Sequence, residues 1–245
     1  MKFLLKIMRI INLLDISKSF KSKEALKNIT IKFDNKKVTG LLGPNGSGKT
    51  TLFNIIAGFL NPDKGEIFLD ENRITRLSLR DRSNLGISYL PQEASIFRDM
   101  SVYDNILSIA QLFHDNKNSK IVTEDLIEQF SLNGFVKTKG KYLSGGERRR
   151  TEIARALASK PAFLLLDEPF AGIDPIAIEE VKSTINFLKK LEVGVIITDH
   201  NVREALNIVD FSYIIYNGEI IKSGTPKDIT SDKFVKKIYL GENYN

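Results

Sequence analysis

A glycine-rich segment that contains one lysine, Gly43-Pro-Asn-Gly-Ser-Gly48-Lys49-Thr50, could bind phosphate. It matches the pattern G-x-x-x-x-G-K-[ST], in which glycines let the backbone curl and direct its N–H groups at phosphate oxygens. An apolar run precedes the segment and a helical pattern follows it, so the positive end of a helix dipole would strengthen the site. Lys49 would neutralise the β- and γ-phosphates of ATP, and the Thr50 hydroxyl would ligate Mg²⁺. The residues predicted to contact the nucleotide are Gly43, Pro44, Asn45, Gly46, Ser47, Gly48, Lys49, Thr50 and Thr51.

Two acids end a second apolar run, Phe163–Leu166. A buried strand would deliver Asp167 to the sheet edge beside the phosphate loop, where it could support Mg²⁺. Glu168 would then be placed to hold or deprotonate the water that attacks the γ-phosphate. The alternative is an ordinary acidic turn before Pro169, and the phosphate loop elsewhere in the chain favours the catalytic interpretation.

A third apolar run, Val193–Thr198, ends in Asp199 and His200. It has the form of the second run: a buried strand that delivers polar residues to the same edge. A histidine there could donate a hydrogen bond to the γ-phosphate and respond to its loss. An isolated histidine is also often structural, so these residues alone leave both roles open.

The segment Leu143-Ser144-Gly145-Gly146-Glu147 comes directly before a helical run, Arg148–Ala158. We expect Ser144 to neighbour the N-cap and the two glycines to expose backbone N–H groups, which makes a second anion-binding surface. The two phosphate sites of one chain would face different directions. The simplest use is an antiparallel homodimer, in which each Ser-Gly-Gly closes over ATP on the partner's phosphate loop.

Eight strand candidates would position these residues in an α/β fold. The early candidates lie close together, as hairpin strands do, and the later ones alternate with helical patterns, as in a parallel sheet. Between about Phe97 and Gly140 helical patterns such as Val102–Phe113 and Thr123–Phe130 replace strands, with a polar turn expected at His114–Lys120. The strand candidates are Ile10–Ile16, Ile29–Phe33, Val38–Leu42, Gly65–Leu69, Ile87–Leu90, Phe163–Leu166, Val193–Thr198 and Tyr213–Tyr216.

Composition narrows the class of protein. The chain has 245 residues, of which 42% are hydrophobic and 27% charged, an ordinary globular balance. It contains no cysteine, which excludes disulfides and thiolate metal sites. The formal net charge is +6, but the lysines are scattered, so we expect no nucleic-acid partner. Lysines and an arginine interrupt the apolar N-terminal run, and residues 1–7 are interpreted as a possible extension before a start at Met8.

Together these motifs, in this order and spacing, resemble the ATPase subunits of ABC (ATP-binding cassette) transporters. The resemblance covers nearly the whole chain from about Leu13 onward. It implies a P-loop NTPase fold with a RecA-like parallel-sheet core, an N-terminal antiparallel β subdomain and an inserted α-helical subdomain. The expected ABC ATPase domain spans residues 8–245, with the core at about 8–95 and 151–245 and the helical subdomain at about 96–150.

The same resemblance implies further site residues. Gln92 would touch Mg²⁺ and the attacking water, so that Thr50, Gln92 and Asp167 would surround the metal. Asp174 would cross the dimer interface, and His200 would be the switch histidine. Phe20 matches the aromatic residue that stacks on adenine, where the family more often has tyrosine; its alternative is a plain core residue.

Several longer segments resemble the ATPase family of lipopolysaccharide export transporters, among them Tyr89–Arg98, Leu143–Arg150 and Thr198–Glu204. This implies a peripheral subunit on the cytoplasmic face of the bacterial inner membrane, bound to two integral membrane permease subunits. If exposed, Phe97 would line a socket for a helix of the membrane subunit. The alternatives are the ATPase of a branched-chain amino-acid importer and, further off, an ABC ATPase without a transport role.

Overall fold

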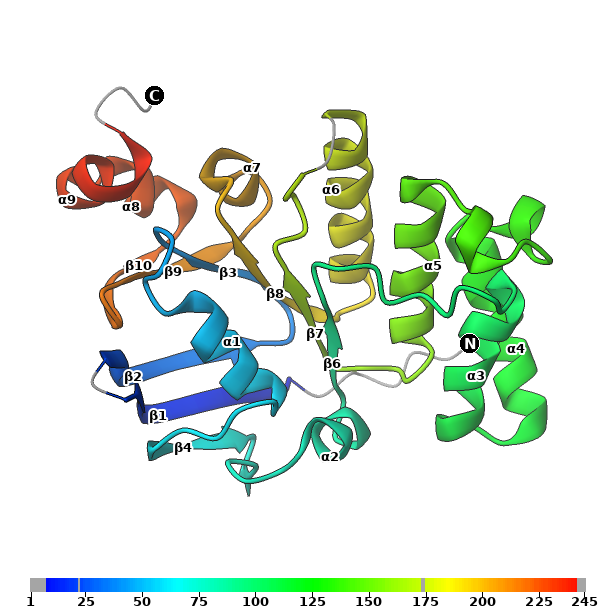
Figure 1. Ribbon diagram of the computed structural model, residues 1–245, viewed down its shortest axis with the longest axis horizontal. Coiled ribbons are helices and arrows are strands. Elements are labelled where there is room, and N and C mark those ends of the chain that lie inside the picture. Colours follow the sequence, from blue (N-terminus) through cyan, green and yellow to red (C-terminus); the bar gives the residue numbers. More distant parts are fainter. Residues whose placement is uncertain (1–7, 22, 173–174, 242–245) are drawn as a thin grey trace.

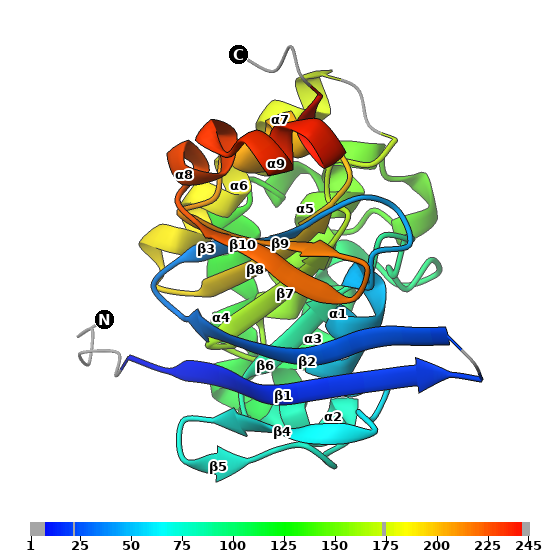
Figure 2. The same cartoon turned by 90° about the vertical axis from the view of Figure 1, so that its left-hand side faces the viewer.

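The computed structural model describes residues 8–21, 23–172 and 175–241. Its N-terminal part is an antiparallel sheet of order β2-β1-β4-β5, seen at the bottom of Figure 2. The strands are β1 (Ile10–Phe20), β2 (Lys23–Asp34), β4 (Lys64–Leu69) and β5 (Asn72–Arg73).

A second sheet has six strands in the order β10-β9-β3-β8-β7-β6. The neighbours from β9 to β6 pair in parallel, and β10 pairs antiparallel with β9 at one edge. Parallel strands end in the same direction, so the loops after β3, β7 and β8 meet at one edge of the sheet. The strands are β3 (Val38–Leu42), β6 (Ile87–Leu90), β7 (Phe163–Asp167), β8 (Gly194–Asp199), β9 (Phe211–Tyr216) and β10 (Glu219–Gly224).

Strand β7 shows how the two faces of this sheet are covered. Its side chains alternate, because successive residues of a strand point to opposite faces. Phe163 and Leu165 join the core that includes α1 (Lys49–Ala57) and the antiparallel sheet, while Leu164 and Leu166 join the core beneath the remaining helices. Helix α1 therefore lies between the two sheets, as Figure 1 shows. Burial on both faces explains why the run Phe163–Leu166 contains no polar residue.

Three helices, α3 (Val102–Phe113), α4 (Asn116–Gln129) and α5 (Gly145–Leu157), stand together beside the parallel sheet (Figure 1). Helix α3 has the predicted bounds. The polar turn expected at His114–Lys120 was wrong for most of its length, because the Asp115 side chain accepts the N–H groups of Lys117 and Asn118 and starts α4 there.

Shorter helices complete the fold: α2 (Leu79–Asn84) precedes β6, and α7 (Val202–Leu206) follows β8. The long helix α6 (Pro175–Lys190) packs on the sheet, and α8 (Pro226–Ser231) and α9 (Lys233–Val235) follow β10. Single 3₁₀ turns occur at Asn133–Phe135 and Gly140–Tyr142, and a π-helical turn (η3) at Lys236–Leu240.

The predicted α/β class is confirmed, and all eight strand candidates correspond to strands. Strands β5 and β10 were not predicted; both lie at sheet edges, and β10 is largely half-exposed, so neither carries a continuous apolar run. None of the described helices has the length and apolar character needed to cross a membrane. Residues 1–7, interpreted as an extension, lie outside the described residues, and the subdomain boundaries stay a prediction.

Candidate active site

The glycine-rich segment joins β3 to α1 at the edge where the parallel strands end. Gly43 and Gly48 have φ angles of 155° and 114°, which side-chain-bearing residues rarely adopt. A Cβ on Gly43 would lie 2.1 Å from the Ile215 carbonyl oxygen, and one on Gly48 would lie 2.7 Å from that of Ala25. Only glycine allows this close approach, and the resulting curl suits an anion-binding loop.

Lys49 and Ser47 give this loop its polar interior. The Lys49 ammonium is buried and donates to the carbonyl oxygens of Gly43 and Pro44, at 2.7 and 2.9 Å. Burial lowers the pKa of Lys49, and the carboxylates of Glu168, Asp199 and Asp167 act in the opposite direction. The Ser47 hydroxyl is buried and has no hydrogen-bond partner. A buried unpaired hydroxyl beside an ammonium is suited to a phosphate oxygen.

Asp167 stands at the end of β7 with its orientation fixed from two sides. The Thr198 hydroxyl donates to one carboxylate oxygen at 2.6 Å, and the Tyr89 hydroxyl donates to the other at 3.2 Å. Burial, with the nearby Asp167 charge, raises the pKa of Tyr89, so this phenol stays a donor. The two bonds hold the carboxylate at the edge where sequence analysis placed it.

The donor set fits a magnesium ion that is bound mainly through phosphate. Among the residues that the structure describes, no group of three or more His, Cys, Asp or Glu side chains could hold a metal by itself. Mg²⁺ beside nucleotide phosphates takes only one or two protein carboxylates and keeps other oxygen ligands. Asp167, with the exposed Thr50 and Gln92, offers such a partial set.

Glu168 and His200 are in direct contact. Glu168 Oε2 lies 3.1 Å from His200 Nδ1. Glu168 has a φ of 42°, and its N–H donates to the Thr198 carbonyl oxygen at 2.9 Å. A glutamate in this strained conformation, locked to the neighbouring strand, is typical of a functional position. The structure thus brings together the two polar residues that sequence analysis placed on separate strands.

Asp199 is a residue whose role sequence analysis did not assign. Its fully buried carboxylate accepts the N–H of Phe170 at 2.8 Å and that of Asn201 at 2.7 Å. It therefore ties the loop after Glu168 to the loop that contains His200. Burial raises the pKa of Asp199, and the two N–H donors act in the opposite direction. Its position, at the end of a buried and mostly apolar strand, was the available signal.

The Leu-Ser-Gly-Gly-Glu segment opens α5, with Ser144 as the N-cap itself rather than its neighbour. The Ser144 N–H donates to the Glu147 carboxylate at 2.8 Å, and the Glu147 N–H donates to the Ser144 hydroxyl at 3.4 Å. This capping box satisfies two helix-end donors and fixes the start of α5. Gly145 is exposed, so the first turn of the helix is accessible from outside.

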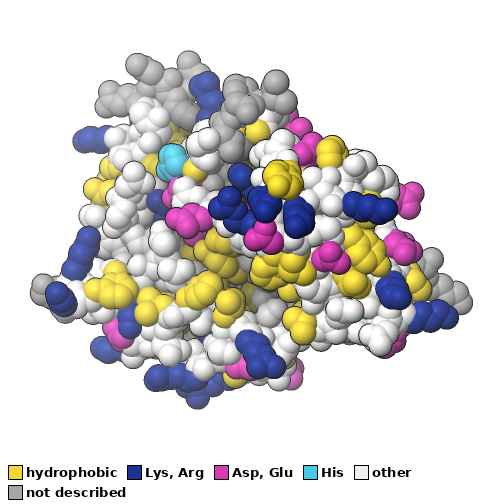
Figure 3. Space-filling view, turned by 45° about the vertical axis from the view of Figure 1, so that its right-hand side comes forward, with side chains coloured by type: hydrophobic (Ala, Val, Ile, Leu, Met, Phe, Trp, Pro, Cys, Tyr) yellow, Lys and Arg dark blue, Asp and Glu magenta, His cyan; other side chains and the backbone are white. Residues whose placement is uncertain are grey.

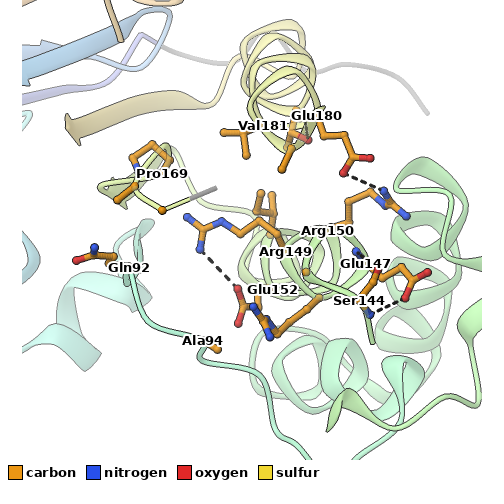
Figure 4. A pocket seen from close by; sticks show the side chains of 18 of the residues that line it. Gln92, Ala94, Ser144, Glu147, Arg149, Arg150, Glu152, Pro169, Glu180 and Val181 are labelled. Carbon is orange, nitrogen blue, oxygen red and sulfur yellow. Dashed lines mark hydrogen bonds and ion pairs between the residues drawn. The ribbon is translucent and has the colours of Figure 1, made fainter. Parts of the chain in front are cut away.

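Two charged residues of α5 bind the segment that contains Gln92. Arg149 donates to the Pro91 carbonyl oxygen at 3.2 Å, and the buried Glu152 accepts the N–H groups of Ser95 and Ile96 at 2.7 and 3.1 Å. Figure 4 shows the ion pair between Arg149 and Glu152, both of which belong to α5. A movement of α5 would therefore be transmitted to Gln92.

Gln92, Glu168 and the start of α5 line one open cleft of about 690 Å³ (Figure 4). Its wall includes Glu180 on α6, which pairs with Arg150 at 3.5 Å. The cleft brings one strand-end residue, Glu168, and the Ser-Gly-Gly segment to a shared surface. Asp174, predicted to cross a dimer interface, lies outside the described residues.

The two aromatic candidates are both accessible. Phe20 is 49% exposed at the end of β1, on the hairpin whose Ala25 touches the phosphate loop. Phe97 is 44% exposed, and the Arg155 guanidinium stacks 4.7 Å from its ring centre. Phe97 and Arg155 line a groove of about 570 Å³ between α2, β6, α3 and α5. On the face shown in Figure 3, hydrophobic side chains gather along a hollow.

Comparison with known proteins identifies the class. The pattern that defines the ABC transporter family matches residues 26–171 of this chain, from β2 to just after Glu168. The chain belongs to the ABC transporter family and is an ABC ATPase. The family resemblance inferred from the motifs is thereby confirmed.

Within that family the chain is similar to the lipopolysaccharide export system ATP-binding protein LptB. It is 44% identical to LptB of Haemophilus influenzae over 97% of this chain and 99% of the relative. It is also 44% identical to LptB of Escherichia coli K12, over 94% of this chain and 96% of the relative.

A solved ATP-binding cassette of an ABC transporter, in its ADP conformation, is 31% identical with a TM-score of 0.84 and covers 96% of this chain and 99% of its own.

Proposed function

We propose that this chain is the ATP-hydrolysing subunit of a lipopolysaccharide export transporter. Two copies would close around two ATP molecules and drive extraction of lipopolysaccharide from the bacterial inner membrane. The contact between Glu168 and His200, held at the edge beside Lys49, carries the ATPase part of the proposal. The similarity to LptB carries the choice of transporter.

The hydrolysis step follows from the residues at the strand ends. Glu168 holds or deprotonates the attacking water, and His200 contacts the γ-phosphate through its other ring nitrogen. Lys49 and the N–H groups of the loop stabilise the negative charge that develops on the phosphate oxygens. Thr50, Gln92 and Asp167 would hold Mg²⁺, which would neutralise negative charge on the phosphates.

The Ser-Gly-Gly segment supplies the second half of each site. Its N–H groups, at the start of a capped helix, would bind the γ-phosphate of ATP on the partner copy. Ser144, Gly145, Gly146 and Asp174 would form this composite surface, with Phe20 stacked on adenine. Loss of the γ-phosphate would then remove the contacts that keep the dimer closed.

The groove beside Phe97 is where we place the membrane subunits. A short helix of each of two permease subunits would fit there, which puts the chain on the cytoplasmic face of the inner membrane. Because α5 borders this groove and is bonded to the Gln92 segment, closure of the dimer would move the docked helix. We propose no nucleic-acid partner for this chain.

The identity of the transporter is tested by its partners. Gentle solubilisation of membranes and affinity purification of this subunit should yield two permease subunits of lipopolysaccharide export. Co-purification of amino-acid permeases would favour a branched-chain amino-acid importer, and a soluble nucleic-acid or ribosomal complex would favour a non-transport role. Both of these outcomes would overturn the proposed substrate and leave the ATPase chemistry in place.

A further inference from the structure

The C-terminal segment returns to the edge of the sheet where the site lies. In both ribbon views α8 and α9 lie at the same end of the molecule as α7, which follows β8 (Figures 1 and 2). Ile229 and Val235 are buried there, and the rings of Tyr216 and Phe234 meet edge to face at 6.4 Å. The segment is therefore packed onto the core rather than projecting from it.

This segment ends in an unusual backbone turn. The Gly241 N–H donates to the Lys236 carbonyl oxygen at 2.8 Å, which closes a π-helical turn over Lys236–Leu240. Such wide turns are rare and often occur at functional sites. Tyr239 lies within this turn.

The Tyr239 hydroxyl lies close to two loops of the candidate site. It donates to the Asp199 carbonyl oxygen at 3.4 Å, and the Gly43 N–H faces the same phenol oxygen, where it acts to lower the pKa of Tyr239. Gly43 is the first residue of the phosphate loop, and Asp199 precedes the histidine that contacts Glu168. One hydroxyl group thus bridges the loop that holds phosphate and the loop that holds His200.

We propose that Tyr239 is a positioning residue for ATP hydrolysis, which fixes the spacing between the phosphate loop and the Glu168–His200 pair. The inference rests on the proposed ATPase function and adds the C-terminal segment to the machinery. The bridge needs a group that donates and accepts at once, and a tyrosine hydroxyl does both.

The surroundings keep this hydroxyl protonated. Burial raises the pKa of Tyr239, and the charges of Asp199 and Glu168 raise it further, against the effect of the Gly43 N–H. The phenol therefore remains a donor to Asp199 across the physiological range. No change of protonation is part of the proposed role.

The Tyr239→Phe variant tests the inference, because it keeps the ring and removes only the bridge. One hydrogen bond near a reacting group corresponds to about a fivefold change in rate. We expect kcat for ATP hydrolysis to fall about fivefold, while KM for ATP changes less than about twofold. Tyr216→Phe is the matched control: it removes a phenol from the same surface, and we expect the wild-type kcat.

Further measurements distinguish failure of this inference from failure of the proposed function. In the Glu168→Gln background, Tyr239→Phe should leave ATP-dependent dimerisation unchanged, since positioning acts on the hydrolysis step. The inference is overturned if Tyr239→Phe has the wild-type kcat, or if kcat falls only together with thermal stability and ATP affinity. Absence of ATP hydrolysis by the wild-type chain would instead contradict the proposed function on which the inference rests.

Discussion

Three carboxylates lie close together at the ends of β7 and β8, and the surroundings of each carboxylate suit it to a different role. Asp167 is held by the hydroxyls of Thr198 and Tyr89, in the place for a metal-supporting group. Asp199 is fully buried and bonded to two backbone N–H groups, so its part is structural. Glu168 faces the cleft and His200, which leaves it as the acid with access to water.

Replacement of Glu168 by glutamine should separate ATP binding from hydrolysis. The amide keeps the size and polarity of the side chain but cannot take a proton from water. Loss of a general base lowers rates by a factor of about 10² to 10⁴. We expect Glu168→Gln to bind ATP, to hydrolyse it at least about a hundredfold more slowly, and to accumulate as an ATP-bound dimer in gel filtration.

The control for this variant is Glu179→Gln on α6, where an exposed carboxylate pairs with Lys182 at 2.8 Å. It removes a similar charge without touching the site, and hydrolysis should be unchanged. A Glu168→Gln protein that turns over ATP at the wild-type rate would remove Glu168 from the mechanism.

At the scale of elements, helix α1 depends on a buried arginine that the sequence did not single out. The Arg82 guanidinium is fully buried and donates to carbonyl oxygens at the end of α1 and in the segment before α2. Its acceptors are Ile55, Ile56, Ile74, Thr75 and Leu77. Burial lowers the pKa of Arg82 to about 10, so the group stays charged at neutral pH. It anchors the helix whose first turn forms part of the phosphate loop.

Arg82→Gln should therefore destabilise the whole domain. The shorter amide cannot reach all these carbonyl oxygens, and buried unpaired acceptors are costly. We expect the free energy of unfolding to fall by about 3 kcal/mol in chemical denaturation. Arg76→Gln, at an exposed position nearby, should change it by less than about 0.5 kcal/mol. Equal stability of the two variants would show that the buried network contributes nothing.

The C-terminal elements depend on an aspartate cap. Asp232 accepts the N–H groups of Val235 and Phe234 and pairs with Lys222 at 3.1 Å, and these bonds lower the pKa of Asp232. Because the folded value is lowered, this contribution is present above the ordinary pKa of 3.8 and is lost as pH falls through the lowered value.

Asp232→Asn should loosen α9 at neutral pH, where the wild-type carboxylate is charged. Limited proteolysis at pH 7 should cut the C-terminal segment of the variant faster than that of the wild type. The difference between the variant and the wild type should shrink as pH falls below 3.8 and through the lowered pKa of Asp232. Equal cleavage rates at pH 7 would contradict a stabilising role for the cap.

The burial of an element determined how well it could be predicted from the sequence. Strands β3, β7 and β8 are covered on both faces, so continuous apolar runs marked them and the polar residues at their ends. The start of α4 was missed because polar residues such as Ser119 and Thr123 are buried in it. The contact of Tyr239 with the site could not be predicted, because it depends on a π-helical turn and on tertiary packing.

At the scale of the whole molecule, the nucleotide site and the groove beside Phe97 are separate surfaces, and helix α5 connects them. One end of this helix carries the Ser-Gly-Gly segment, and its side chains bind the Gln92 segment and line the groove beside Phe97. Nucleotide-dependent movement of the helical part would therefore reach a partner docked in the groove. The proposed transport cycle needs this connection.

Phe97→Ala should break this connection without affecting the nucleotide site. The variant removes an exposed ring at the groove and the stacking partner of Arg155. We expect ATP binding by the isolated chain to match the wild type, while transport by the assembled complex is lost. Normal transport at normal protein levels would remove Phe97 from the docking surface.

The most direct measurement is ATP-dependent release of lipopolysaccharide from vesicles that contain this chain and the permease subunits that co-purify with it. Our account predicts release with the wild-type chain and ATP, and none with Glu168→Gln or without ATP. ATP hydrolysis by the assembled complex with no release of lipopolysaccharide would contradict the central claim, even though the ATPase site is active.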